Sequence, residues 1–208
     1  MDERTVDFYE RHAAETAARH RSLDPTPWRA RFLSAFARRG KMLDVGCGCG
    51  RDLELLLELG FDARGTEPSA AMRAEAERAY PTLAGRILPH ALPLPDPAVL
   101  GGPFDGIVCS AVLMHVPEDE LPEAVGSLRR ALRPGGRLWL TVPAKRSALD
   151  GDRRDGGGRL FRDLPPARLL ALGRAAGLHT LSTWEEPDRL GRADLRWHGC
   201  LLAAGGTP

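Results

Sequence analysis

The chain has 208 residues, enough for a single domain with a substantial buried core. Its formal net charge of +1 gives no overall field that would favour nucleic acid or an acidic membrane. Its apolar runs are too short to span a bilayer. The charged start Met1-Asp2-Glu3-Arg4 has no apolar signal segment behind it, which favours a cytoplasmic location.

The first 39 residues are predicted to be helical. A helix is expected over residues 3–20, and Leu23-Asp24-Pro25-Thr26-Pro27 breaks it. Trp28, Phe32 and Phe36 recur every four residues, which predicts a second amphipathic helix before Gly40.

The most informative segment is an apolar strand, 41–45, that runs into Gly46-Cys47-Gly48-Cys49-Gly50 and then into a helix over 51–59. Glycine takes positive φ and lets a ligand lie against bare backbone. The amides at a helix start are unpaired and point outward. The spacing is G-x-G-x-G, with Arg51 at the sixth position, so it differs from the dinucleotide pattern G-x-G-x-x-G. The segment predicts a pocket for a nucleoside-like cofactor.

Strands and helices alternate along the rest of the chain. Strands are predicted at 62–66, 86–88, 106–110 and 137–142, with helices over 69–80 and 121–132 between them. This alternation predicts a parallel sheet with right-handed crossovers. Residues 144–164 are polar and glycine-rich, and are predicted to form a mobile insert outside the core. A helix over 165–176 and strands at 178–184 and 197–203 follow, with a frayed tail over 204–208.

Asp44 and the glycine loop resemble motif I of the class I S-adenosylmethionine (SAM) methyltransferases, in particular their small bacterial members. Four later segments resemble that family in the same order, over roughly 40–145: Gly65-Thr66-Glu67-Pro68, 104–110, 112–116 and 132–138. The resemblance implies an α/β, Rossmann-like, doubly wound fold. Its seven-stranded sheet would be mostly parallel, with an antiparallel last strand and helices on both faces. It also implies one methyltransferase domain over 1–208, with a helical lid (1–39), a SAM-binding core (40–145), a variable insert (144–164) and a closing helix and hairpin (165–203).

The resemblance implies SAM as cofactor and S-adenosylhomocysteine as product. Asp44 would orient the loop or the methionine amino group, and Glu67 has two oxygens for two ribose hydroxyls. Where relatives often carry an acid that faces the adenine amino group, this chain has His90. No metal is expected, because Cys47-x-Cys49 lacks Cys or His partners nearby. The residues expected at the cofactor are Asp44, Gly46, Cys47, Gly48, Gly50, Arg51, Asp52, Glu67, Pro68, Met72, His90, Ala91, Leu92 and Ser110.

His115 and Tyr9 are the candidate catalytic residues. His115 follows the fourth strand at the carboxyl edge, where ligands bind in open α/β sheets, and histidine titrates near neutral pH. The alternative for His115 is a structural or pocket-lining role, and for Tyr9 an ordinary amphipathic contact. Whether the reaction needs a general base stays open.

Arginines in the insert and near the C-terminus are candidates for acceptor binding. Arg146, Arg159 and Arg192 are the residues selected, because a guanidinium binds carboxylate or phosphate in a bidentate fork. The alternative is a solvated surface with internal Asp–Arg pairs, since acids are interleaved throughout.

The resemblance therefore implies SAM-dependent methyl transfer to a small-molecule acceptor at O, N or S, with an anionic acceptor as one option. Nucleic acid and membrane partners are not expected, and the protein would be a monomer or homodimer. Two alternatives remain: an RNA or protein methyltransferase whose insert grips phosphate, or a non-catalytic SAM-binding or partner-binding domain.

Overall fold

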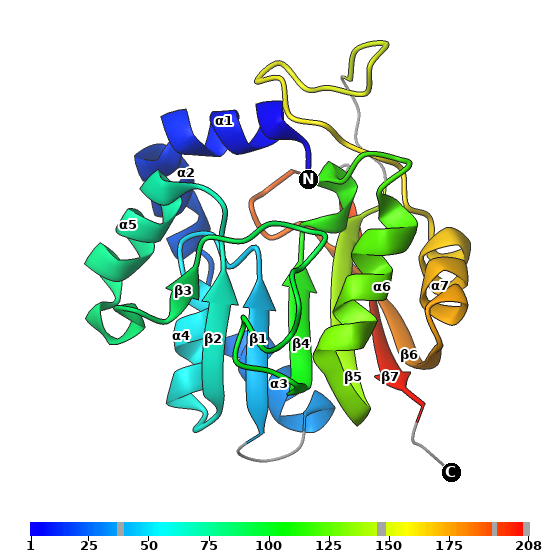
Figure 1. Ribbon diagram of the computed structural model, residues 1–208. Helices are drawn as coiled ribbons and strands as arrows, with labels where there is room; N and C mark the ends of the chain where they lie inside the picture. The colour runs from blue at the N-terminus through cyan, green and yellow to red at the C-terminus, as the bar shows by residue number, and fades with distance from the viewer. Residues whose placement is uncertain (37–39, 145–148, 193–194, 206–208) are drawn as a thin grey trace.

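The computed structural model describes residues 1–36, 40–144, 149–192 and 195–205 (Figure 1). Within these residues a 7-stranded sheet has the order β3-β2-β1-β4-β5-β7-β6. The strands are β1 (Lys41–Val45), β2 (Asp62–Thr66), β3 (Ile87–Leu88), β4 (Phe104–Ser110), β5 (Leu132–Pro143), β6 (Leu178–Pro187) and β7 (Arg196–Ala204).

The sheet confirms the predicted fold class. β1 pairs in parallel with β2 and β4, as do β2 with β3 and β4 with β5. β7 is antiparallel to both β5 and β6, so it alone among these strands runs against the others. The strand order changes direction between β1 and β4, and ligands of open α/β sheets bind at the carboxyl ends beside such a point.

Helices cover both faces of the sheet (Figure 1). α6 and α7 lie on one face, where their leucines join the same apolar cluster as β4 and β5. α3, α4 and α5 contribute to the cluster on the other face. The helices are α1 (Glu3–Arg11), α2 (Ala13–Arg21), α3 (Thr26–Ala35), α4 (Arg51–Glu58), α5 (Ala70–Ala79), α6 (Leu121–Ala131) and α7 (Pro166–Ala175), with 3-10 turns η1 (Pro81–Leu83) and η2 (Leu113–His115).

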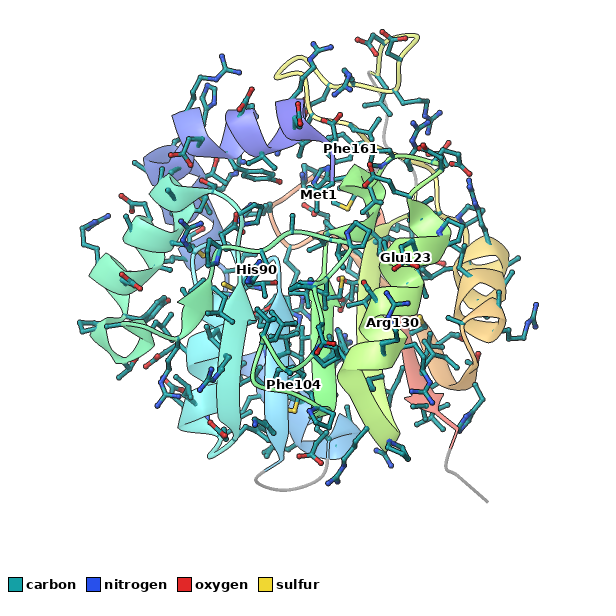
Figure 2. All side chains as sticks on the ribbon, viewed as in Figure 1. Met1, His90, Phe104, Glu123, Arg130 and Phe161 are labelled. Atoms are coloured by element: carbon teal, nitrogen blue, oxygen red, sulfur yellow. The ribbon has the colours of Figure 1, made fainter. Side chains whose placement is uncertain are left out.

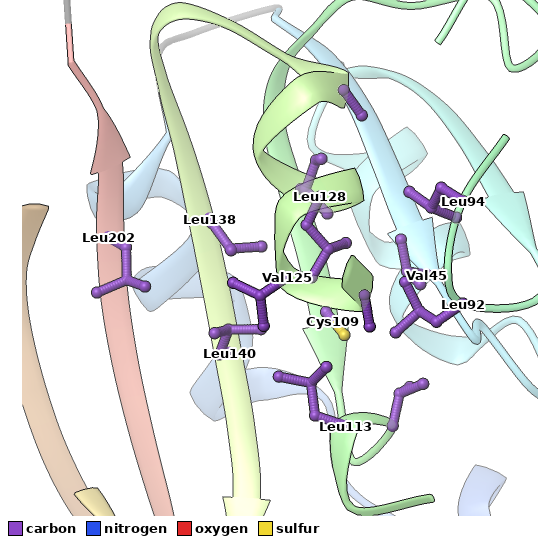
Figure 3. Packing of buried hydrophobic residues seen from close by; sticks show 14 of the residues in the cluster. Val45, Leu92, Leu94, Cys109, Leu113, Val125, Leu128, Leu138, Leu140 and Leu202 are labelled. Carbon is purple, nitrogen blue, oxygen red and sulfur yellow. The ribbon is translucent and has the colours of Figure 1, made fainter. Parts of the chain in front are cut away.

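The core has a distinct composition on each face. Figure 3 shows Val125 and Leu128 of α6 packed over Leu138, Leu140 and Cys109 of the sheet. On the opposite face the packing is aromatic: the Phe32 ring lies edge-on to Trp139, with centroids 5.4 Å apart. Because helices cover both faces, the central strands are almost continuously buried, as expected for parallel sheets.

The predicted single helix over 3–20 is wrong. It is two helices, because His12 has φ −118° and ψ 24° and leaves the helical region. The His12 backbone N–H donates to the Phe8 carbonyl, and its ring stacks on the Phe8 ring with centroids 4.4 Å apart. This break lets α1 cross above the carboxyl ends of the strands while α2 turns against α5 (Figure 1).

The prediction that the whole 144–164 insert lies outside the core is also wrong. Leu160, Phe161 and Leu164 are buried, and Phe161 lies above the sheet (Figure 2), where it lines the same cavity as Met1. The Phe161 and His115 rings meet edge-on, with centroids 4.8 Å apart. Among the described residues, no helix is both long and apolar enough to cross a bilayer.

Candidate active site

A cavity of about 550 Å³ lies at the carboxyl ends of the central strands. Its floor includes Asp44 of β1, the loop after β1, Glu67 after β2 and Ser110 of β4. α1 and the insert contribute Tyr9 and Arg159. The sheet thus brings residues from distant parts of the chain to the position where its topology predicts a ligand.

The glycine loop depends on the absence of side chains. Gly46, Gly48 and Gly50 have φ of 64°, 54° and 78°, a region that favours glycine. A Cβ on Gly46 would lie 2.6 Å from a methyl group of Val112, and one on Gly50 would lie 2.4 Å from a methyl group of Leu83. Backbone bonds from Cys47 N to Thr66 O and from Gly50 N to Cys47 O hold the loop against β2.

The Glu67 carboxylate links the two loops of the cofactor side. Oε2 accepts from the Gly48 amide at 3.1 Å and Oε1 accepts from the Ser69 amide at 2.9 Å. Burial raises the pKa of Glu67 to about 7, and these two bonds oppose that rise. Each oxygen keeps a second lone-pair site, which suits a ligand with two adjacent hydroxyls.

Asp44 is buried in the cavity wall, and its Oδ2 has no hydrogen-bond partner among the described residues. Burial is the main cause that raises its pKa well above the usual value, the neighbouring Asp52 adds to the rise, and Arg51 opposes it. A buried carboxylate without a donor is costly. An ammonium group on a ligand would supply that donor and the opposite charge.

Arg51 and Asp52 line the cavity but are paired with each other, Arg51 Nε to Asp52 Oδ1 at 2.8 Å. The Arg51 guanidinium also lies 4.6 Å from the centroid of the Trp28 ring. Of the other residues predicted at the cofactor, the lining set includes Gly46, Cys47, Gly48, Pro68, Met72 and Ser110, and does not include Gly50.

The three residues predicted at the adenine edge are not brought to the cavity. His90, Ala91 and Leu92 do not line it. The Leu92 side chain is 2% exposed and packs in the core near Val45 (Figure 3). Figure 2 shows His90 in the loop that leaves β3.

The two candidate catalytic side chains face each other in the cavity wall. The Tyr9 hydroxyl is 3.4 Å from His115 Nε2, and His115 Nδ1 is 2.6 Å from the Leu160 carbonyl oxygen. Because a carbonyl only accepts hydrogen bonds, Nδ1 carries the proton of the neutral imidazole. Nε2 is then the acceptor, and it faces Tyr9.

Arg159 and Arg192 line the cavity, but both are engaged internally. The Arg159 Nε and Nη2 donate to Asp155 Oδ2 at 3.0 and 2.6 Å, and Arg192 makes the same kind of pair with Asp188. Internal Asp–Arg pairs, the alternative considered for these arginines, are therefore present. Arg146 lies outside the described residues.

Several lining residues were not predicted individually. They come from α2, α3, the insert and the β6–β7 connection: Arg19, His20, Trp28, Phe161, Glu186, Asp188, Leu190, Leu195 and Trp197. For Phe161, the local signal was that Leu160-Phe161 is an apolar pair inside a polar insert.

Comparison with known proteins agrees with this geometry. A family model described as "Methyltransferase domain" matches residues 17–201. An uncharacterized methyltransferase of Oceanobacillus iheyensis is 30% identical over 133 residues, 60% of this chain and 59% of that protein. A ubiquinone biosynthesis O-methyltransferase of Methylococcus capsulatus is 29% identical over 127 residues, 56% of this chain and 49% of that protein. The chain spans about half the length of these curated relatives.

Among solved structures, the fold resembles the 1,6-didemethyltoxoflavin N1-methyltransferase of Burkholderia thailandensis. The TM-score is 0.75 with 21% identity, covering 96% of this chain and 87% of that one. The family model spans most of the described core. The chain therefore belongs to the methyltransferase domain family.

Proposed function

We propose that the protein transfers a methyl group from SAM to a small-molecule acceptor, with His115 as general base and Tyr9 beside it. One observation carries this proposal: a single cavity joins Asp44, the glycine loop and Glu67 to the His115–Tyr9 pair. When bound, SAM supplies a methyl group already activated by its sulfonium. The task left to the protein is to hold two ligands in line and to exclude water.

The cofactor side fits SAM in charge and hydrogen-bonding capacity. Glu67 would accept hydrogen bonds from the ribose hydroxyls. Each of its oxygens already accepts one hydrogen bond from a loop amide and can accept another. Asp44 would accept from the methionine ammonium, which would give its unpartnered Oδ2 a donor. Gly46 and Gly48 would let the ligand lie against the loop backbone.

The acceptor side fits a ligand that gives up a proton. His115 Nε2 is an acceptor in the neutral ring, as the Leu160 carbonyl holds the proton on Nδ1. Proton removal by a positioned side chain contributes roughly 10²–10⁴-fold to such reactions. The ubiquinone biosynthesis O-methyltransferase and the didemethyltoxoflavin methyltransferase, whose names refer to small molecules, support a small-molecule acceptor.

We also propose an anionic acceptor, on the charges at the α2 end of the cavity. Arg19 is the lining arginine for which the described residues offer no carboxylate partner; Arg51, Arg159, Arg189 and Arg192 each have one. Burial and the nearby guanidinium groups, that of Arg19 foremost, lower the pKa of His20 to about 4. His20 is therefore neutral at pH 7, and Arg19 leaves a positive charge available to an anion.

Two measurements test the proposal. Calorimetry should detect binding of SAM and S-adenosylhomocysteine to the full chain. Incubation with SAM and a metabolite mixture should give a mass gain of one methyl on an acceptor, and acidic compounds should be over-represented among those that react. A folded protein that binds neither ligand would refute the proposed activity.

A further inference from the structure

Two consecutive residues of the insert contact the two ends of the Tyr9–His115 pair. Arg159 Nη1 is 3.5 Å from the Tyr9 hydroxyl oxygen. The Leu160 carbonyl oxygen is 2.6 Å from His115 Nδ1. The pair itself comes from α1 and η2, which are far from the insert in sequence.

Arg159, Tyr9, His115 and Leu160 form a series of three hydrogen bonds, and the chemistry of these groups fixes the direction of each bond. A guanidinium only donates, so the Tyr9 oxygen accepts from Arg159. A carbonyl only accepts, so His115 donates from Nδ1, and in the neutral ring Nε2 bears a lone pair. The Tyr9 proton is therefore directed at His115 Nε2, 3.4 Å away. The sequence of donation is Arg159 to Tyr9, Tyr9 to His115, and His115 to Leu160.

Other contacts hold Arg159 and Leu160 where they are. Asp155 accepts two bonds from the Arg159 guanidinium, which also lies 4.3 Å from the centroid of the Phe8 ring. The Leu160 amide donates to the buried Thr5 hydroxyl at 2.9 Å. The insert is thus fixed to α1 at Arg159, through Phe8, and at Leu160, through Thr5.

We propose that Arg159 is a positioning residue that orients the Tyr9 hydroxyl toward His115 Nε2, while the Leu160 carbonyl sets the His115 tautomer. This inference rests on the proposed methyl transfer. Arg159 then positions the general base. Its place in the cavity wall alone would instead indicate that it binds the methyl acceptor. The insert therefore covers the catalytic pair and also supplies one hydrogen-bond partner to each of its members.

The arrangement also assigns a class of acceptor: a hydroxyl or an N–H group that is protonated on arrival. A carboxylate needs no base and would not use this chain of donors. The acceptor lone pair forms the bond to the methyl carbon as that carbon leaves the sulfur, which keeps the electron pair. The acceptor proton passes to the Tyr9 oxygen and the Tyr9 proton to His115 Nε2, giving an imidazolium whose Nδ1–H stays on Leu160.

Nitrogen NMR of histidine-labelled full-length protein with S-adenosylhomocysteine tests the inference without an acceptor. Long-range proton–nitrogen spectra distinguish protonated from bare ring nitrogens, and the loss of signals in His115→Gln assigns His115. We expect Nδ1 protonated and Nε2 bare. Tyr9→Phe and Arg159→Met should both shift the Nε2 resonance, and Arg159→Lys, which keeps a donor and the charge, should move it back toward wild type.

Matched controls separate this effect from general disturbance. Tyr80→Phe changes the other tyrosine of the chain, and Arg196→Met changes an arginine that pairs with Glu185 outside the cavity lining; both should leave the His115 signals unmoved. A wild-type protein with the proton on Nε2 would overturn the inference. So would an Arg159→Met spectrum identical to wild type while Tyr9→Phe shifts Nε2. Either result with S-adenosylhomocysteine bound refutes this inference alone, whereas failure to bind it refutes the proposed function.

Discussion

At the residue scale, Glu67 combines a functional position with an electrostatic cost. Burial raises the pKa of Glu67 to about 7, whereas the pKa in the unfolded chain is near 4.5. Between these two pH values the Glu67 carboxyl group is protonated in the folded protein and ionised in the unfolded chain. The free energy of unfolding of the ligand-free protein therefore falls as pH rises from about 4.5 to 7. A ligand that donates two hydroxyl hydrogen bonds to the ionised carboxylate would offset that cost.

SAM affinity should accordingly rise with pH toward 7 and level off above it. Glu67→Gln should remove this rise and weaken binding at pH 8 by roughly 1–3 kcal/mol, the range for lost hydrogen bonds to a charged group. Calorimetric titrations between pH 5.5 and 8 measure both. Any slope that survives in Glu67→Gln belongs to Asp44, whose pKa is also raised, and Asp44→Asn is the variant that removes it. Equal affinities of the wild type and Glu67→Gln at pH 8 would contradict a ribose contact.

His115→Gln tests the base separately from the cofactor site. The imidazole is buried and contacts Tyr9 and Leu160, whereas Glu67 accepts hydrogen bonds from the Gly48 and Ser69 amides. The substitution should lower kcat by roughly 10²–10⁴-fold while the Kd of S-adenosylhomocysteine changes little. Single-turnover methyl transfer and calorimetry on the same preparation give the two numbers. An unchanged kcat would assign His115 a lining role, the alternative that its sequence position left open.

At the scale of the element, the turn from β1 into α4 shows why three glycines stand there. Gly50 caps α4 in the left-handed region, and its Cβ position is occupied by Leu83. Gly60 is also left-handed, at φ 84°, but a Cβ there meets nothing within 4 Å. The two positions therefore separate backbone strain from steric overlap.

Gly60→Ala should cost about 1 kcal/mol of unfolding free energy, the penalty for a left-handed alanine. Gly50→Ala carries the same strain plus the overlap, and should cost at least about 2 kcal/mol more. Urea unfolding of both variants measures the difference. If the two substitutions cost the same, Leu83 moves aside without loss, and the close packing of this turn is not what requires glycine.

Elements with local signals could be predicted from the sequence. The strand–loop–helix around Gly46 follows from glycine spacing, and the central strands from their apolar runs. The break at His12 could not be predicted, because no glycine or proline marks it and an alanine-rich helical segment follows it directly. The two helices have different surroundings: α1 lines the cavity as well as contacting α5, and α2 packs mainly on α5.

The residues at the adenine edge could not be assigned from the sequence for a related reason. β3 has only two residues, so counting along the chain did not fix which side chains leave it toward the cavity. The Leu92 side chain is in the core, as its apolar character favours. The pairing of Arg159 with Asp155 and its approach to Tyr9 bring together the insert and α1, and no pattern within either segment indicates that contact.

At the scale of the whole molecule, α1 and the insert form one cover over the carboxyl edge of the sheet (Figure 1). Arg154 donates to both carboxylate oxygens of Asp2, at 2.9 and 2.8 Å. The Arg154 guanidinium lowers the pKa of Asp2 to about 2, so the stabilisation from this contact is fully present above about pH 4 and is lost as pH falls through about 2. The Asp2 amide donates to the His115 carbonyl, which ties the cover to η2.

A ligand as large as SAM must enter beneath this cover, so we expect α1 and residues 149–161 to open and close together. Hydrogen exchange in both segments should slow when S-adenosylhomocysteine is added, while β1 and β4 change little.

Arg154→Gln removes the Asp2 contact from the insert side alone. It should nevertheless speed exchange in α1 as well, because α1 loses the partner of its N-cap residue. Arg168→Gln, which breaks an exposed pair with Glu118 away from the cavity, is the matched control. Faster exchange confined to the insert in Arg154→Gln would mean that the two segments move independently, and exchange indifferent to ligand would mean that they do not gate the site.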